Sequence, residues 1–444
     1  MSGRGDIKRV MCIKAAKRLR NFIGLEDFFE EKIYSFVLIL YLVLIVFSPD
    51  FTLGSLEAHV IEFRLSDIFL LFILGWTFYR WLRGQMEIFV PRFTYPAAIY
   101  VATYFLSALV AFIKGGAGQG LQGVFFAIKH FEYFLIFLVV ANLVRRKATP
   151  AYLRRLFIFL AFLAGLWLVL NPFMQGINLS LTIDLRDLSL DYYHLGGGRY
   201  TIPFAKGAPP SAEFMEIAIP VGIFSLLSAG TAFSFSFYFL AIGVMVAGFL
   251  FTGSRAPIGS FFASILLVGP FLDRRIIVWG LVGLIVVGLV IAFVPQVRDR
   301  LGTYIEILKG GLRTDNALEK RVFKIWPRGI RQFIKNPIVG RGLAGFKNDD
   351  TQYIRTLANQ GLIGIAAFFV FIYGLFRNLI RVRRKASEGG TYEILASALI
   401  ISTVALLING ITATSFQPVR AMEPFWFLLG LVFAFEKFKV IEGD

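Results

Sequence analysis

Arginine side chains beside apolar segments are the residues of this sequence whose types and positions could do chemistry. Arg255 follows small residues in TGSRAPIG, Arg199 ends the stretch GGGR, and Arg420 lies in SFQPVRAMEP. An ionisable residue near membrane depth is costly and is read as functional by default. Guanidinium groups also match the geometry of phosphate oxygens. The three arginines therefore indicate an anionic ligand, with snorkelling to lipid headgroups as the alternative for Arg255.

Residues 295–356 carry an excess of positive charge that also calls for a partner. Thirteen basic residues stand against six acidic ones, a net charge of +7. Arg321, Arg328 and Arg331 lie in RVFKIWPRGIRQFIKN, where the spacing of apolar positions predicts short helices. A specific anionic ligand would explain the charge, and so would general contact with anionic headgroups.

Charged residues within one apolar block suggest a second kind of chemistry. Lys129, His130 and Glu132 lie in AIKHFEYF, and the three-residue spacing places Lys129 and Glu132 on one helix face. A structural ion pair is the favoured interpretation, and a coupled proton site is the alternative. The single cysteine, Cys12, excludes a disulfide framework or a cysteine metal site, and we expect no metal.

The elements that must position these residues are membrane-spanning helices. Of 444 residues, 57% are hydrophobic and 17% are charged, whereas soluble proteins average roughly 45–50% apolar and about 25% charged. The apolar residues form blocks of about twenty, which is the length of a transmembrane helix. We therefore expect an all-α polytopic membrane protein with a single transmembrane domain over residues 1–444. The twelve predicted spans are 33–48, 65–82, 95–113, 123–143, 152–171, 212–229, 233–251, 256–271, 276–294, 357–376, 391–409 and 423–437.

Basic residues predict how these helices are oriented. A net charge of +17 would suggest nucleic acid in a soluble protein, but lysine and arginine collect in the cytoplasmic loops of membrane proteins. We therefore expect no nucleic-acid partner. Cytoplasmic N- and C-termini place most basic clusters inside, among them 145–147, 274–275 and 381–385. Two long segments, 172–211 and 295–356, then lie on the external face.

Three segments of the second half carry motifs in a characteristic order. They read GGGRYTIPFAKGAPPSAEF, then TGSRAPIGSFFASILL, then KNPIVGRGLAGFKNDDTQYIRTLANQGLIGIAAFFVFIYGLF, and cover roughly residues 195–380. With twelve spans and a long segment before the tenth, this order resembles the O-antigen ligase and O-antigen polymerase superfamily of bacterial membrane glycosyltransferases. The N-terminal half resembles that superfamily only in its hydropathy.

The resemblance implies a C-type glycosyltransferase-like enzyme of cell-surface polysaccharide or lipopolysaccharide biosynthesis. Such enzymes transfer a glycan from undecaprenyl diphosphate at the periplasmic face of the bacterial inner membrane, without a cofactor or metal. The acceptor is another lipid-linked glycan, lipid A core or a protein. Membrane lipids, a chain-length regulator and a flippase would be further partners.

The resemblance also assigns roles to individual residues. The arginines at the family's motifs hold the diphosphate, and by position this role falls on Arg199, Arg255 and Arg321. Arg328, Arg331 and Tyr353, which lie near these motifs, are further candidates for substrate binding, and so is Arg420, which its charge beside an apolar segment singles out.

One position bears on the choice between the two branches of the superfamily. Ligases of this group place a histidine eleven residues before the first glycine of Gly-x-x-Gly, whereas here Asp350 precedes Gly361 by that distance. The Asp-x-x-Tyr pattern of Asp350 and Tyr353 looks more like the polymerases. Polymerisation at the non-reducing end of a lipid-linked unit is therefore favoured, and ligation to lipid A core is the alternative.

The chemistry in this interpretation needs both cations and a base. Fixed guanidinium groups, Arg255 and Arg321 first among them, would stabilise the charge that develops on the leaving diphosphate. A carboxylate would orient the acceptor hydroxyl or accept its proton. Asp350 is the first candidate for this base, with Asp349 and Glu213 as alternatives.

A transporter, such as a lipid-linked glycan flippase, is the competing class of protein. Twelve spans and the charges of AIKHFEYF suit it, but transporters usually place the substrate near the midplane between repeated halves. No internal repeat is evident here, and the unexplained charge lies on one face. A scaffold protein would leave Arg255 without a purpose.

Overall fold

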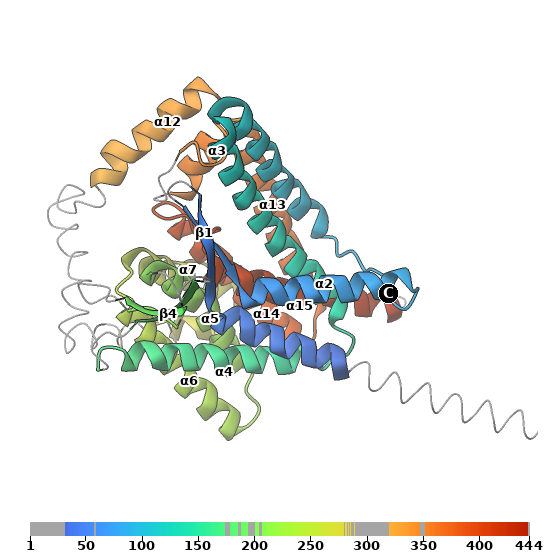
Figure 1. Ribbon diagram of the computed structural model, residues 1–444. Coiled ribbons are helices and arrows are strands. Elements are labelled where there is room, and N and C mark those ends of the chain that lie inside the picture. Colours follow the sequence, from blue (N-terminus) through green and yellow to red (C-terminus); the bar gives the residue numbers. More distant parts are fainter. Residues whose placement is uncertain are drawn as a thin grey trace, which may run out of the picture.

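Long apolar helices make up most of the described chain. The computed structural model describes residues 32–56, 59–173, 178–184, 188–193, 200–203, 207–278 with five further positions up to 288, 319–346 and 351–442. Eight helices in these ranges are long and apolar enough to cross a membrane. The expected fold class, an all-α polytopic membrane protein, is confirmed (Figure 1).

The helices follow the apolar blocks of the sequence closely. After a first helix, Lys32–Phe47, they are α2 (Leu65–Leu82), α3 (Thr94–Leu143), α4 (Thr149–Leu170), α5 (Ala208–Leu227), α6 (Ala232–Phe251), α7 (Arg255–Leu272), α12 (Trp326–Lys335), α13 (Gln352–Lys385), α14 (Thr391–Asn409) and α15 (Val419–Glu442). A short π-helix, η2 (Lys320–Ile325), precedes α12, and residues 275–278 begin another helix.

The number of spans can be compared with the predicted twelve. Helix α3 contains non-helical backbone at Gly116, which divides it into two arms that match the predicted spans 95–113 and 123–143. Gly123 in the second arm packs closely against Ala108 and Ala111 in the first, and a Cβ at this position would crowd them. The two arms therefore run back along each other. Most of 276–294 lies outside the described residues, and the total of twelve stays a prediction.

A small four-stranded sheet joins two segments that the sequence suggested were loops. Its order is β2-β1-β3-β4, with β1 at Asp50–Leu56, β2 at His59–Arg64, β3 at Asn178–Asp184 and β4 at Leu188–Tyr193. Strand β1 pairs in parallel with β3, which brings the hairpin after the first helix beside the segment after α4 (Figure 1). Apolar and polar residues alternate in NLSLTID and at the start of LSLDYY, a pattern typical of strands that we did not predict from the sequence.

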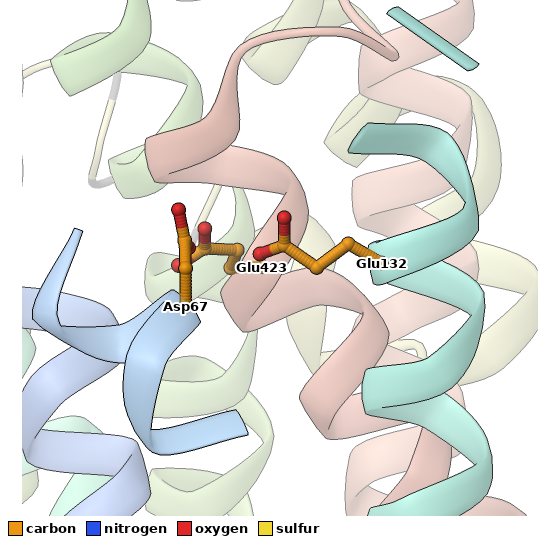
Figure 2. Close-up of side chains that lie close together, drawn as sticks. All are labelled: Asp67, Glu132 and Glu423. Carbon is orange, nitrogen blue, oxygen red and sulfur yellow. The ribbon is translucent and has the colours of Figure 1, made fainter. Parts of the chain in front are cut away.

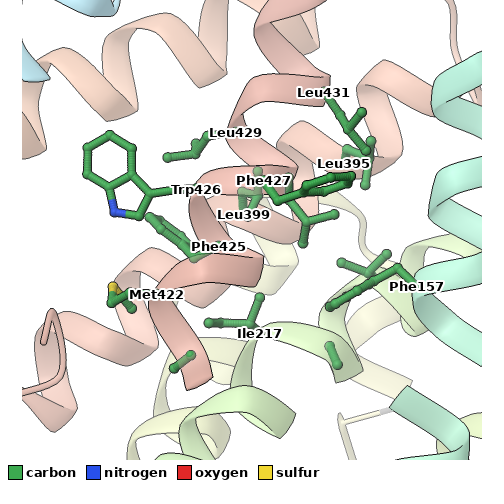
Figure 3. Close-up of a cluster of buried hydrophobic side chains, with 14 of the residues drawn as sticks. Phe157, Ile217, Leu395, Leu399, Met422, Phe425, Trp426, Phe427, Leu429 and Leu431 are labelled. Atoms are coloured by element: carbon green, nitrogen blue, oxygen red, sulfur yellow. The ribbon is translucent and has the colours of Figure 1, made fainter. Parts of the chain in front are cut away.

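The apolar core is formed where α4, α5, α14 and α15 meet. Figure 3 shows Phe157 from α4 and Ile217 from α5 beside Leu399 from α14 and Phe427 from α15, and all four are fully buried. They belong to one hydrophobic cluster, to which α4 and α5 from the first half of the sequence and α14 and α15 from its end contribute. This packing fixes the relative positions of the helix ends that carry the polar residues described below.

Candidate functional site

The turn between α14 and α15 connects three of the segments that carry candidate residues. The side-chain amide of Asn409, the last residue of α14, donates a 2.9 Å hydrogen bond to Oε1 of Glu213 on α5. The next residue, Gly410, accepts a 2.9 Å hydrogen bond from the backbone N–H of Gln352 at the start of α13. The start of α13 is therefore bound to Gly410, and the preceding residue, Asn409, binds Glu213.

A second carboxylate links α5 to the helix of Arg255. Glu216 lies one turn after Glu213 and is completely buried, and its Oε1 accepts a 2.5 Å hydrogen bond from Ser260 on α7. Arg255 is the first residue of α7 and is partly exposed. The predicted positions of Arg255 and Glu213 thus lie on two helices that are bonded to each other.

Several buried oxygens at this end of the bundle have no hydrogen-bond partner among the described residues. They include Oε2 of Glu213, Oε2 of Glu216, Oδ1 of Asn409 and Oε1 of Gln352. Buried polar atoms of native proteins are nearly always satisfied by protein or water. Four such atoms on α5, α13 and α14 therefore mark this region as a place where polar groups of a ligand or water could bind.

The arginines of the loop helix lie on a separate, attached element. Arg321 is in η2 and is partly exposed, and Arg328 and Arg331 are exposed on α12. Helix α12 approaches α13 through Gly329, whose position leaves no room for a Cβ beside Ile354. The short helices predicted in this part of residues 295–356 are confirmed.

Two predicted substrate-binding residues have clear contacts within the protein. Arg420 is only 2% exposed, and its guanidinium donates to the backbone oxygens of Val46 and Ser48. The hydroxyl of Tyr353 donates a 2.6 Å hydrogen bond to the carbonyl of Leu407. These contacts tie α15 to the first helix and α13 to α14, and the substrate-binding role of the two residues stays a prediction.

Carboxylates from α2, α3 and α15 lie close together (Figure 2), and they surround one ammonium group, that of Lys129. Nζ of Lys129 lies 3.0 Å from Oδ1 of Asp67, 2.7 Å from Oε2 of Glu132 and 3.4 Å from Oε1 of Glu423. Arg64 adds a second cation, 3.6 Å from Glu423. The structural ion pair predicted for Lys129 and Glu132 is confirmed, within a larger network.

The ammonium group of Lys129 holds the three carboxylates of this network together. Carboxylate oxygens of Asp67, Glu132 and Glu423 all lie within 4.8 Å of one another, a spacing that would also suit a metal ion. The ammonium of Lys129 already occupies the space between them and contacts all three. His130 points elsewhere: its Nδ1 is bonded to the carbonyl of Phe126, and its ring stacks on Tyr104 with 3.6 Å between centroids.

The glycine-rich segment before α13 is bound to a break in that helix. Gly361 has non-helical backbone (φ 65°, ψ −157°), and the amides of Leu362 and Ile363 donate to the carbonyls of Pro337 and Ile338. Before the break, the carbonyls of Ala358 and Asn359 accept from the amides of Arg341 and Gly342. A helix break leaves backbone groups without intrahelical partners. Residues 337–342 satisfy four of them, which gives this motif a structural reason.

Some candidate residues lie outside the described part of the chain. They are Arg199, Asp349 and Asp350. Thr351 and Gln352, which directly follow Asp350 in the sequence, are described and lie beside the α14–α15 turn.

Sequence reasoning missed several polar residues that the structure places beside the predicted ones. Glu216, Asn409 and Ser260 were not singled out, although a second glutamate three residues after Glu213 in an apolar helix is a detectable signal. Asp67 and Glu423 were missed because their partner Lys129 is distant in the sequence.

Fold and site together define a polytopic membrane protein with polar and charged groups gathered at the ends of α2, α5, α13, α14 and α15. Residues 240–369 match the family model described as O-antigen ligase. This match supports the resemblance to the O-antigen ligase and polymerase superfamily, and with it a glycosyltransferase-like function in polysaccharide biosynthesis. The match covers α7, α12, the glycine-rich segment and the first half of α13. A search of the curated proteins found no match.

Proposed function

We propose that the protein transfers a glycan from undecaprenyl diphosphate to the non-reducing end of another lipid-linked unit at the periplasmic face of the bacterial inner membrane. The observation that carries the proposal is the pair of bonds from α5: Glu216 to Ser260 on the helix of Arg255, and Glu213 to Asn409 beside the start of α13. These bonds connect the helix that begins at Arg255, the carboxylate of Glu213 and the turn that binds the start of α13, which supports a common site for Arg255, Glu213 and Asp350.

We assign the binding and charge stabilisation of the diphosphate leaving group to the arginines. Arg255 begins α7, where the preceding Thr252, Gly253 and Ser254 have small side chains that allow a ligand to approach. Arg321, Arg328 and Arg331 lie on η2 and α12, which pack against the start of α13 through Gly329 and Ile354, and we assign them the same role, which Arg199 would complete. Positive charge fixed before the reaction stabilises a developing anion without reorganisation.

We assign the activation of the acceptor hydroxyl to a carboxylate. Asp350 stands immediately before Thr351, whose hydroxyl lies 3.4 Å from the carbonyl of Gly410. Thr351 and Gln352 are anchored at the turn that also holds Glu213. Asp350 acts as the base, and a single base with direct displacement inverts the anomeric carbon. Glu213 and Asp349 are the alternatives.

Ligation to lipid A core is the second candidate function. The match of residues 240–369 to the O-antigen ligase family model favours it, whereas the aspartate at position 350, in place of a histidine, favours polymerisation. A flippase is disfavoured, because Lys129 and its carboxylates are occupied with one another.

The test uses the purified full-length protein and lipid-diphosphate-linked repeat units as the only substrate. A ladder of longer lipid-linked products, absent with Arg255→Ala, is expected for a polymerase. Product that forms only after lipid A core is added would identify a ligase instead. No transfer to either acceptor would contradict glycosyl transfer altogether.

A further inference from the structure

A group of basic residues near the end of α13 is not used by the proposed function. Two adjoining hollows of about 480 Å³ and about 370 Å³ lie there, and both are lined by Tyr373, Arg377 and Arg381. The first also contains Arg384 and Lys385, and the second contains Arg92, just before α3. We call the two hollows together the basic pocket.

The positive charge of the basic pocket is not neutralised within the described part of the chain. Arg377, Arg381 and Arg384 follow one another at four and three residues, so they share one helix face and repel each other. None of the five basic residues of the pocket forms a salt bridge with a described carboxylate. Arg383, on a different face of the same turn, lies 3.9 Å from Glu393.

The carboxylate bonded to the backbone of Arg92 does not change this balance. Glu436 on α15 accepts a 3.1 Å hydrogen bond from the backbone N–H of Arg92, and this bond leaves the guanidinium available. Arg381 donates to the neutral side chain of Asn378 at 3.1 Å. The pocket therefore presents several guanidinium groups and an ammonium group to one space without an internal anion.

A general rule of membrane topology does not require such a pocket. The preference for lysine and arginine in cytoplasmic loops is met wherever these side chains point. Here they converge from α13 and from the residues before α3 on hollows of a size that accommodates small ligands. Forked guanidinium groups in this arrangement suit phosphate oxygens.

The surface next to the pocket is apolar and exposed. Phe369, Val370 and Tyr373 are 56%, 45% and 66% exposed on α13, directly before Arg377. In a membrane protein such side chains face acyl chains. We propose that the basic pocket binds the phosphate headgroup of an anionic phospholipid whose acyl chains lie along this face of α13.

The test measures lipid binding to the full-length protein by native mass spectrometry, with cardiolipin and phosphatidylcholine as probes. Cardiolipin is expected to bind in preference. The double variant Arg377→Gln/Arg381→Gln should weaken cardiolipin binding roughly 25-fold, since each basic residue near a membrane surface contributes roughly fivefold. The charge-retaining variant Arg377→Lys/Arg381→Lys should lose much less.

The matched control removes the same charge elsewhere. Arg83 and Arg274 are exposed and lie in neither hollow, so Arg83→Gln/Arg274→Gln should leave cardiolipin binding within about twofold of the unmodified protein. Equal weakening in both double variants would mean that only net charge matters and would overturn the proposal. Competition by inorganic phosphate as strong as by cardiolipin would also overturn it, because a soluble anion would then be the ligand.

Discussion

Asn409 and Glu213 are joined by a 2.9 Å hydrogen bond between a side-chain amide and a carboxylate, both almost completely buried. The bond connects the last residue of α14 with the first turn and a half of α5. Because Gly410 holds the start of α13, a change at Asn409 acts on two predicted parts of the site at once.

Replacing this amide by a carboxylate tests the bond directly. Asn409→Asp places two carboxylates against each other in a buried position, and an uncompensated buried charge costs about 3–5 kcal/mol. We expect a clear fall in the unfolding temperature of the detergent-solubilised protein. Asn336→Asp is the control, because Oδ1 of Asn336 already accepts a 2.6 Å hydrogen bond from Lys114 and gains a favourable charge. Equal stability of both variants would contradict the description of Asn409.

Removal of the arginine at the start of α7 should abolish transfer. Arg255→Ala is expected to lower the rate of glycan transfer by roughly 10²–10³, as for other groups that stabilise transition-state charge, while the protein still inserts. Product formation from lipid-linked units measures this. Arg274→Ala, two residues beyond the other end of the same helix, should retain activity. Full-length polymer from Arg255→Ala would refute the diphosphate role.

The proposed base is tested by an isosteric change. Asp350→Asn keeps the size of the side chain and removes its basicity, so turnover should fall by roughly 10²–10⁴ with little change in the affinity for the lipid donor. Donor binding and single-turnover rates separate the two effects. If turnover is unchanged, Glu213→Gln and Asp349→Asn are the next variants, and activity in all three would exclude a carboxylate base.

The lysine within the carboxylate network should be important for stability and not for chemistry. Lys129→Met leaves Asp67, Glu132 and Glu423 facing one another, and removing one partner of a buried network costs about 3–5 kcal/mol. The second change Glu132→Gln should recover part of this loss in thermal unfolding. A stable Lys129→Met variant without transfer activity would point instead to a role in the reaction.

Alanine substitutions at three glycines distinguish the cost of backbone strain from the cost of close packing. Gly75 has free space around it, so Gly75→Ala should be neutral or stabilise α2 by up to about 1 kcal/mol. Gly116 has φ 77° and ψ −176° with free space, so alanine there should cost about 1–3 kcal/mol. Gly361 has similar backbone, and a Cβ would also overlap the carbonyl oxygen of Ile338, so Gly361→Ala should be the most destabilising. Thermal unfolding ranks the three, and a different order would contradict the packing of residues 337–342.

The sequence predicted the elements better than their contacts. Runs of apolar residues located the helices because a membrane span requires a fixed length of apolar chain. The break at Gly361 was not predicted, because a single glycine within an apolar run gives no indication that another segment supplies its hydrogen-bond partners. The strands were missed for a related reason, since β1 pairs with β3, more than a hundred residues away.

The candidate site was predicted in part. Arg255 and Glu213 were singled out because charge in apolar surroundings is conspicuous in a sequence, and their helices do meet. Asn409 and Ser260 are common polar residues, and only the packing of α5 against α7 and α14 gives them a role. Arg420 was identified by its charge, but its backbone partners near Ser48 could be found only from the fold.

The buried charges around Lys129 also bear on the order in which the chain is synthesised. Arg64, Asp67, Lys129 and Glu132 belong to the first third of the sequence, and their formal charges cancel. Arg420 and Glu423, one turn apart on α15, cancel as well. The four early residues and the pair on α15 are therefore each formally neutral before the other group has been synthesised. Helix α15 can therefore pack onto helices that were synthesised much earlier. Neither group carries an uncompensated formal charge in the lipid before they meet.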